Sequence, residues 1–137
     1  MATKIFVNLP VKDLQKSIEF FTKLGYSFNP QFTDEKATCM IIEEGSIYAM
    51  LLVNDFFKTF IDNEIADTSK STESIIALEL TSKEKVDEMV KAAIEAGGTR
   101  YKDRSEMGWM YLDSFADLDG HKWEVFWSDP NSFPQEQ

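Results

Sequence analysis

Apolar residues alternate with polar ones in some stretches of the chain and recur at helical spacing in others. Alternation over Lys4–Leu9 predicts a strand that Pro10 ends. Asp13 is an expected N-cap, and an apolar stripe from Leu14 to Leu24 predicts a helix closed by Gly25. Three more strands are expected after it, at Tyr26–Phe32, Ala37–Ile42 and Ser46–Val53, with a hairpin turn at Glu43-Glu44-Gly45.

The same order of elements recurs in the second half of the chain. Ile75–Leu80 predicts a strand, and Ser82 is an expected N-cap for a helix that Gly97-Gly98 closes. Three strands are again expected, near Thr99–Asp103, Trp109–Phe115 and Lys122–Trp127. This self-similarity predicts two copies of one supersecondary unit.

The repeat gives the domain organisation. We expect a single domain over residues 1–137, with module one at about 4–53, a connector at 54–73 and module two at about 74–128. The connector begins with an apolar helical turn, Phe56–Ile61, and then becomes polar. That turn has three interpretations: ordinary core, a lid over a pocket, or a contact with a partner.

Charge and cysteine content narrow the class of partner and the compartment. The formal net charge of −10 argues against nucleic acid and anionic membrane surfaces as partners, and it suits a neutral or cationic small molecule better. Cys39 is the single cysteine, so the chain forms no internal disulfide, which is typical of a reducing compartment. No signal peptide or membrane span is recognised, and a cytoplasmic location is therefore expected.

Two motifs carry a resemblance to a known family. Val11–Phe21 followed by Leu24-Gly25-Tyr26, and Phe115–Val125 with its Asp117–His121 turn, resemble the vicinal oxygen chelate superfamily, which includes glyoxalases, bleomycin-resistance proteins and dioxygenases. The resemblance implies an α+β fold in which two βαβββ modules form curved mixed sheets around a cavity. It also implies a homodimer, to which the Phe56–Ile61 turn could contribute.

Metal-using members of that superfamily hold the ion with four strand residues. The resemblance places those positions at Phe6, Ile75, Glu124 and Ala49, with Met50 as the alternative one residue away. Phenylalanine, isoleucine and alanine do not coordinate metals, so no metal and no cofactor are expected. The single histidine, His121, falls on the strand face opposite Glu124 and is expected to belong to the turn.

The expected cavity is largely apolar, with a few polar groups. The residues that would line it with Glu124 are Phe6, Asn8, Ala49, Leu51, Ile75, Ala77, Glu79 and Phe126. Glu124 has three interpretations: a general base, an anchor for a ligand amine, or a simple partner of Lys122 or of another strand residue. One hypothesis is a metal-free small-molecule-binding protein of the bleomycin-resistance type, which takes a small, partly aromatic ligand. The other is a glyoxalase- or isomerase-like enzyme of the lactoylglutathione lyase type, which uses Glu124 as base or metal ligand.

Overall fold

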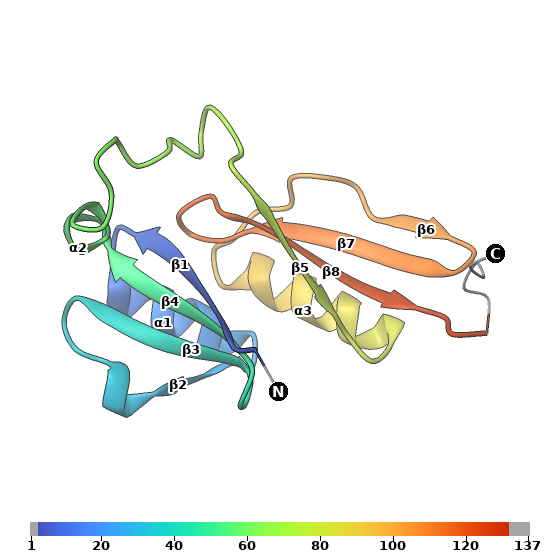
Figure 1. The fold of residues 1–137 in the computed structure, drawn as a ribbon. Coiled ribbons are helices and arrows are strands. Elements are labelled where there is room, and N and C mark those ends of the chain that lie inside the picture. Colours follow the sequence, from blue (N-terminus) through green and yellow to red (C-terminus); the bar gives the residue numbers. More distant parts are fainter. Residues whose placement is uncertain (1–2, 132–137) are drawn as a thin grey trace. The chain divides into compact units, whose positions relative to one another are not determined.

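The chain divides into two compact units in a computed structural model that describes residues 3–131 (Figure 1). Among the described residues, the first unit covers 3–67 and the second covers 68–131. From here on, module one and module two denote these two units, which extend the predicted modules into the connector. The division falls inside the predicted connector. Among the described residues, no helix has the length and apolar character needed to cross a bilayer.

Module one is built on a four-stranded sheet with strand order β1-β4-β3-β2. β1 runs parallel to β4, whereas the other neighbours are antiparallel. Its elements are β1 (Ile5–Val11), α1 (Leu14–Lys23), β2 (Ser27–Asn29), the 3-10 helix η1 (Pro30–Phe32), β3 (Ala37–Glu43), β4 (Ile47–Val53) and α2 (Asn54–Lys58).

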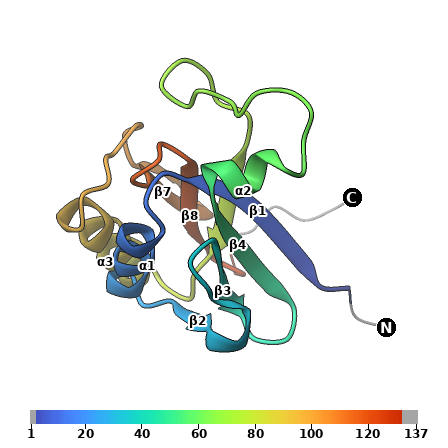
Figure 2. The same ribbon diagram turned by 90° about the vertical axis from the view of Figure 1, so that its left-hand side faces the viewer.

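Helix α1 covers one face of this sheet (Figure 2). Its N-cap is Asp13, whose side chain accepts a hydrogen bond from the backbone N–H of Lys16, as predicted. Phe20 and Phe21 are each 2% exposed, so this side of the helix is core. The strand residues buried on the same side are Leu9, Val11, Thr38, Met40, Ala49 and Leu51.

Module two repeats the arrangement, with strand order β5-β8-β7-β6 and a parallel β5–β8 pair. Its elements are β5 (Ile75–Glu79), α3 (Lys83–Glu95), β6 (Ser105–Met107), β7 (Met110–Ala116) and β8 (Lys122–Ser128). Ser82 caps α3, as predicted. Val86 and Val90 of the helix are buried, and so are Trp123 and Val125 of β8, which face it. The predicted α+β fold is therefore confirmed as two four-stranded mixed sheets, neither of which closes into a barrel.

Three local predictions are corrected. Pro10 lies within β1 because this strand is at the edge of its sheet, where a missing N–H is tolerated. The strand predicted over Tyr26–Phe32 ends at Asn29, whose side chain accepts from the N–H of Gln31 and starts η1. The strand predicted at Thr99–Asp103 is reduced to one bridge between Thr99 and Ala116, and β6 begins later.

Candidate functional site

The candidate site lies on the face of the module-two sheet that is turned away from α3, which we call the open face. Strand alternation and register place alternate residues of three strands there. Those residues are Ile75, Ala77 and Glu79 of β5, Lys122, Glu124 and Phe126 of β8, and Met110, Leu112, Ser114 and Ala116 of β7. All the module-two residues of the predicted cavity are thus on one surface.

Glu124 lies in the middle of the open face, between Ala77 and Ser114. Its side chain is half-buried. Within the described part of the chain, no hydrogen bond or ion pair reaches its carboxylate. The interpretation of Glu124 as a partner of Lys122 is wrong, because the Lys122 ammonium instead donates to the carbonyl oxygen of Gly120 at 3.0 Å. A carboxylate in this position is available to a ligand.

Tyr101, which is not among the residues predicted from the sequence, also belongs to this site. Its hydroxyl lies 3.5 Å from the Trp123 carbonyl oxygen, and its ring centre lies 5.5 Å from the Lys122 ammonium. Burial raises the pKa of Tyr101 and the negative charge of Glu124 raises it further, whereas a hydrogen bond with Ser114 acts in the opposite direction.

The backbone explains how Tyr101 reaches the open face. The bridge from Thr99 to Ala116 holds this segment extended along β7, so successive side chains point to opposite faces. Arg100 points to the α3 side, where it pairs with the buried Asp113 at 2.8 Å. Tyr101 points to the side of Glu124. Alternation around Thr99 was the signal that could have revealed it.

Module one divides its predicted cavity residues between two faces. Phe6 and Asn8 lie on the face turned away from α1, where the Phe6 ring stacks on Tyr48 with 4.9 Å between centres. Ala49 and Leu51 lie on the α1 side and are 0% exposed. The prediction that these two share a face with Phe6 is therefore corrected.

The cause of this error is one extra residue in the turn of module one. Glu124 is four residues after Gly120, whereas the position that shares a face with Phe6 and Asn8 is five residues after Gly45. That position is Met50, which pairs with Asn8 and is half-buried. Met50, the alternative to Ala49 one residue away, is therefore the position in module one that shares a face with Phe6 and Asn8.

The superfamily's metal positions can now be tested against the donor chemistry. The resemblance assigns Phe6 and Met50 of module one and Ile75 and Glu124 of module two to these positions, and only Glu124 offers a hard oxygen ligand. No group of three or more histidine, cysteine, aspartate or glutamate residues that could hold a metal ion occurs between residues 3 and 131. These residues do not fit a divalent metal centre.

His121 belongs to the last turn, as predicted. Its backbone N–H donates to Oδ1 of Asp117 at 3.0 Å, and its residue is 4% exposed. Asp117 also accepts from the N–H of Asp119 at 3.0 Å, an arrangement typical of a turn. Burial is the main cause of the raised pKa of Asp117. The nearby His121 and the hydrogen bonds that Asp117 accepts act in the opposite direction.

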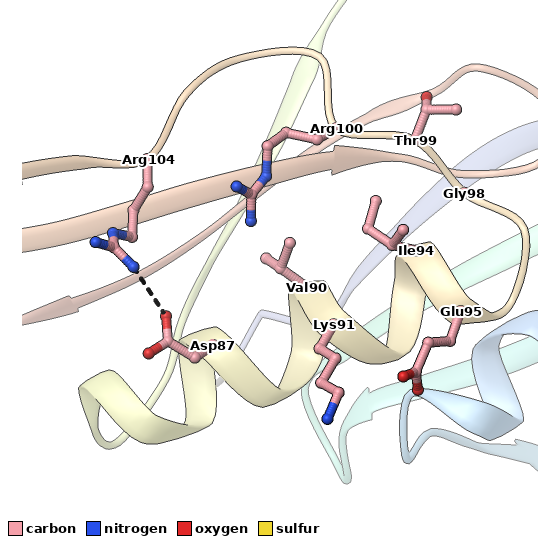
Figure 3. A pocket seen from close by; sticks show the side chains of 9 residues that line it. All are labelled: Asp87, Val90, Lys91, Ile94, Glu95, Gly98, Thr99, Arg100 and Arg104. Carbon is pink, nitrogen blue, oxygen red and sulfur yellow. Dashed lines mark ion pairs between the residues drawn. The ribbon is translucent and has the colours of Figure 1, made fainter.

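A depression lies on the α3 side of module two, away from the open face (Figure 3). It has a volume of about 850 Å³, and α3 and the segment after it form its walls. The lining residues are Asp87, Val90, Lys91, Ile94, Glu95, Gly98, Thr99, Arg100 and Arg104. Its two arginines have acidic partners, since Arg100 pairs with Asp113 and Arg104 lies 3.9 Å from Asp87. The open face, with an unmatched carboxylate, is the stronger candidate.

The comparisons with known proteins agree with this fold. Residues 3–43 match the family model described as bleomycin resistance protein-like N-terminal. The structure is similar to that of hypothetical protein SA1046 from S. aureus, with 29% identity, a TM-score of 0.76 and coverage of 92% of this chain and 94% of that one. No curated protein matches the chain.

Two further solved structures share the fold at lower identity. One is a glyoxalase/bleomycin resistance protein/dioxygenase family enzyme from Burkholderia phytofirmans, at 16% identity and TM-score 0.75, covering 93% of this chain and 99% of that one. The other is the fosfomycin resistance protein FosX from Listeria monocytogenes, at 19% identity and TM-score 0.67. That match covers 100% of this chain and 96% of the other chain. These findings confirm the predicted resemblance.

Proposed function

We propose that this chain, which has the fold of the glyoxalase/bleomycin resistance/dioxygenase superfamily, is a metal-free small-molecule-binding protein whose ligand is anchored by Glu124 on the open face. The observation that carries the proposal is the half-buried carboxylate of Glu124, to which no group of the described chain is bonded. This carboxylate keeps its acceptor sites open on the sheet surface, so a ligand that supplies a cation or a hydrogen-bond donor can bind there.

The surroundings of Glu124 suit a ligand with an apolar part. Ala77 and Ile75 are exposed beside it, and Phe126 is half-buried on the same strand face. Pockets for small molecules combine such apolar surface with a few polar groups that fix orientation. The net charge of −10 also favours a cationic ligand over an anionic one.

Binding is tested with benzylamine and its neutral analogue benzyl alcohol, followed by NMR titration of the full chain. Benzylamine should perturb the open face more strongly than benzyl alcohol, and Glu124→Gln should weaken its binding by about tenfold or more. Glu88 is an exposed residue of α3, and Glu88→Gln removes the same charge. This control substitution should leave benzylamine binding unchanged. Equal binding to the Glu124→Gln variant would remove Glu124 as the anchor.

The metal-free part of the proposal has its own test. Protein purified without chelator should contain no stoichiometric zinc, nickel or iron. A near-stoichiometric metal that is lost in Glu124→Gln would contradict it.

A second candidate is an isomerase-type enzyme in which Glu124 is the base. The same unbonded carboxylate favours it, because a base needs a free acceptor within reach of a substrate proton. Adducts of α-keto aldehydes with thiols are the substrates to screen. Turnover that falls sharply in Glu124→Gln would support this candidate, and no turnover would remove it.

A homodimer is proposed on the exposed apolar surface of module one. Phe60 is 67% exposed and packs edge-on against Phe56, and Ile5 and Phe6 of the edge strand are 51% and 48% exposed. Large apolar side chains that are exposed to this extent can contribute to protein contacts. Sedimentation at high concentration should give a dimer, and a monomer would contradict the proposal.

A further inference from the structure

Two opposite charges on the open face lie near each other without forming a pair. Lys122 and Glu124 are two residues apart on the same face of β8, which separates their backbones by roughly 7 Å along the strand. Long side chains at this spacing can meet. Here the Lys122 ammonium donates to Gly120, and no ion pair reaches Glu124 from the described residues. The two charged groups therefore lie apart on this face, as they would if another group acted as a spacer between them.

Tyr101 lies where it can act as that spacer. Its ring contacts the Lys122 ammonium, with 5.5 Å to the ring centre, a distance typical of a cation–π contact. Its hydroxyl reaches the backbone carbonyl of Trp123, the residue between Lys122 and Glu124 in sequence. The ring thus holds Lys122 on one side, while its hydroxyl end lies within the field of Glu124.

We infer that Tyr101 keeps Lys122 and Glu124 apart, and that the three residues form a site for a small zwitterion on an apolar frame. The ammonium group of the ligand meets Glu124, its carboxylate meets Lys122, and its apolar part lies against Ala77 and Phe126. This inference rests on the proposed function and names the class of ligand that the open face takes.

The chemistry of Lys122 supports two-point binding. An ammonium group has three N–H donors, and Gly120 occupies one of them. The residue is half-buried and has no carboxylate partner among the described residues. A ligand carboxylate there forms a charge-assisted hydrogen bond, as does a ligand ammonium on Glu124. A ligand with both groups gains both contacts for one loss of translational freedom.

Three probes with the same phenyl frame separate the contributions: phenylalanine, phenethylamine and 3-phenylpropanoate. The first carries both charges, and the others carry one each. NMR titration of the full chain should show that phenylalanine binds at least about tenfold more tightly than either. Lys122→Gln should reduce phenylalanine binding to the level of phenethylamine, and Glu124→Gln should reduce it to that of 3-phenylpropanoate.

The spacer role is tested by two substitutions at one position. Tyr101→Phe keeps the ring and should retain phenylalanine binding within a few-fold. Tyr101→Ala removes the ring, lets Lys122 fold onto Glu124, and should lose the preference for the zwitterion. Adding Lys122→Gln to Tyr101→Ala should restore phenethylamine binding by freeing Glu124, which a loss of folding would not do. Circular dichroism checks that each variant is folded.

Each contrary result has a distinct meaning. If phenethylamine binds as tightly as phenylalanine and Lys122→Gln changes nothing, the zwitterion inference is overturned while Glu124 stays the anchor. If Tyr101→Ala binds all probes as the natural chain does, the spacer role is overturned. If no phenyl probe binds at millimolar concentration, the inference fails, and the benzylamine and metal measurements judge the proposed function separately.

Discussion

The indole Nε1 of Trp123 donates a hydrogen bond to Oδ2 of Asp117 at 3.0 Å, inside the core of module two. Trp123 is 1% exposed and Asp117 is 7% exposed. The other oxygen of Asp117 accepts from the N–H groups of Asp119 and His121, so one carboxylate joins the last turn to the core. Removing it takes away an acceptor that three buried or half-buried donors share.

Asp117→Asn should therefore destabilise the protein. An amide can satisfy only part of this set and turns an N–H group toward another donor, so the expected loss in the free energy of unfolding is about 1–3 kcal/mol. Chemical denaturation at neutral pH measures it. Asp103→Asn, an exposed carboxylate with the same change in charge, should lose less than about 0.5 kcal/mol.

The pH dependence of this loss follows from the raised pKa of Asp117. The folded protein holds this proton more tightly than the unfolded chain, in which an aspartate titrates near about 3.9. The resulting stabilisation is fully present below that value and is lost as the pH rises through the folded pKa. The stability of the natural chain relative to Asp117→Asn should thus fall as the pH rises through this range. An increase would contradict the direction of the shift.

Arg100→Ala should be far more harmful than Arg104→Ala. The Asp113 side chain is 1% exposed, and Arg100 neutralises it at 2.8 Å. Because Arg100 is itself 46% exposed, we expect a loss of roughly 2–3 kcal/mol, below the range for fully buried pairs. The side chains of Arg104 and Asp87 are both about half exposed, and their charged groups lie 3.9 Å apart. Arg104→Ala should therefore lower the free energy of unfolding by no more than about 1 kcal/mol. Thermal unfolding of both variants measures the difference. If Arg100→Ala and Arg104→Ala lose similar stability, the burial of Asp113 does not determine the strength of its ion pair.

Gly120→Ala should be worse than Gly25→Ala, although both glycines have positive φ. The angles are +81° and +104°, and left-handed backbone costs an alanine about 1–2 kcal/mol at either position. A methyl group on Gly25 meets nothing within 4 Å, whereas on Gly120 it collides with the Thr68 side chain. Thermal unfolding should show the added penalty. Thr68→Ala combined with Gly120→Ala should then be less than additive.

Glu124→Gln should lower the pKa of Tyr101. The negative charge of Glu124 is one cause of the raised pKa, and the substitution removes it. Ultraviolet titration, with Tyr101→Phe subtracted to isolate this phenol, measures the change. Burial is the larger cause and stays in place, so the pKa should remain above that of a free tyrosine. An unchanged titration would show that the carboxylate is too distant to act on Tyr101.

Periodicity and caps predicted most of the fold because they are local. Asp13, Ser82 and the turn glycines start and end the elements where the sequence indicated. Pro10 was misjudged because its tolerance depends on β1 being an edge strand, which is a property of the whole sheet.

The site was predicted less completely. Glu124 was found because its motif and strand are local, and the repeat supplied its approximate counterpart in module one. Whether that counterpart is Ala49 or Met50 depends on one extra residue after Gly45, compared with the turn at Gly120. Alignment of the two glycines does not reveal this difference. Tyr101 was missed because it lies in a segment with a single bridge, outside any regular strand.

The parallel pairing of first and last strands has a consequence for how the protein is made. β1 finds its neighbour only when β4 has been synthesised, so the sheet of module one is complete once Val53 has left the ribosome tunnel. The strands of module two follow later in the chain and have not emerged at that moment. Module one can therefore finish its own hydrogen bonding before module two emerges, and in each module the search for distant strand partners is confined to about fifty residues.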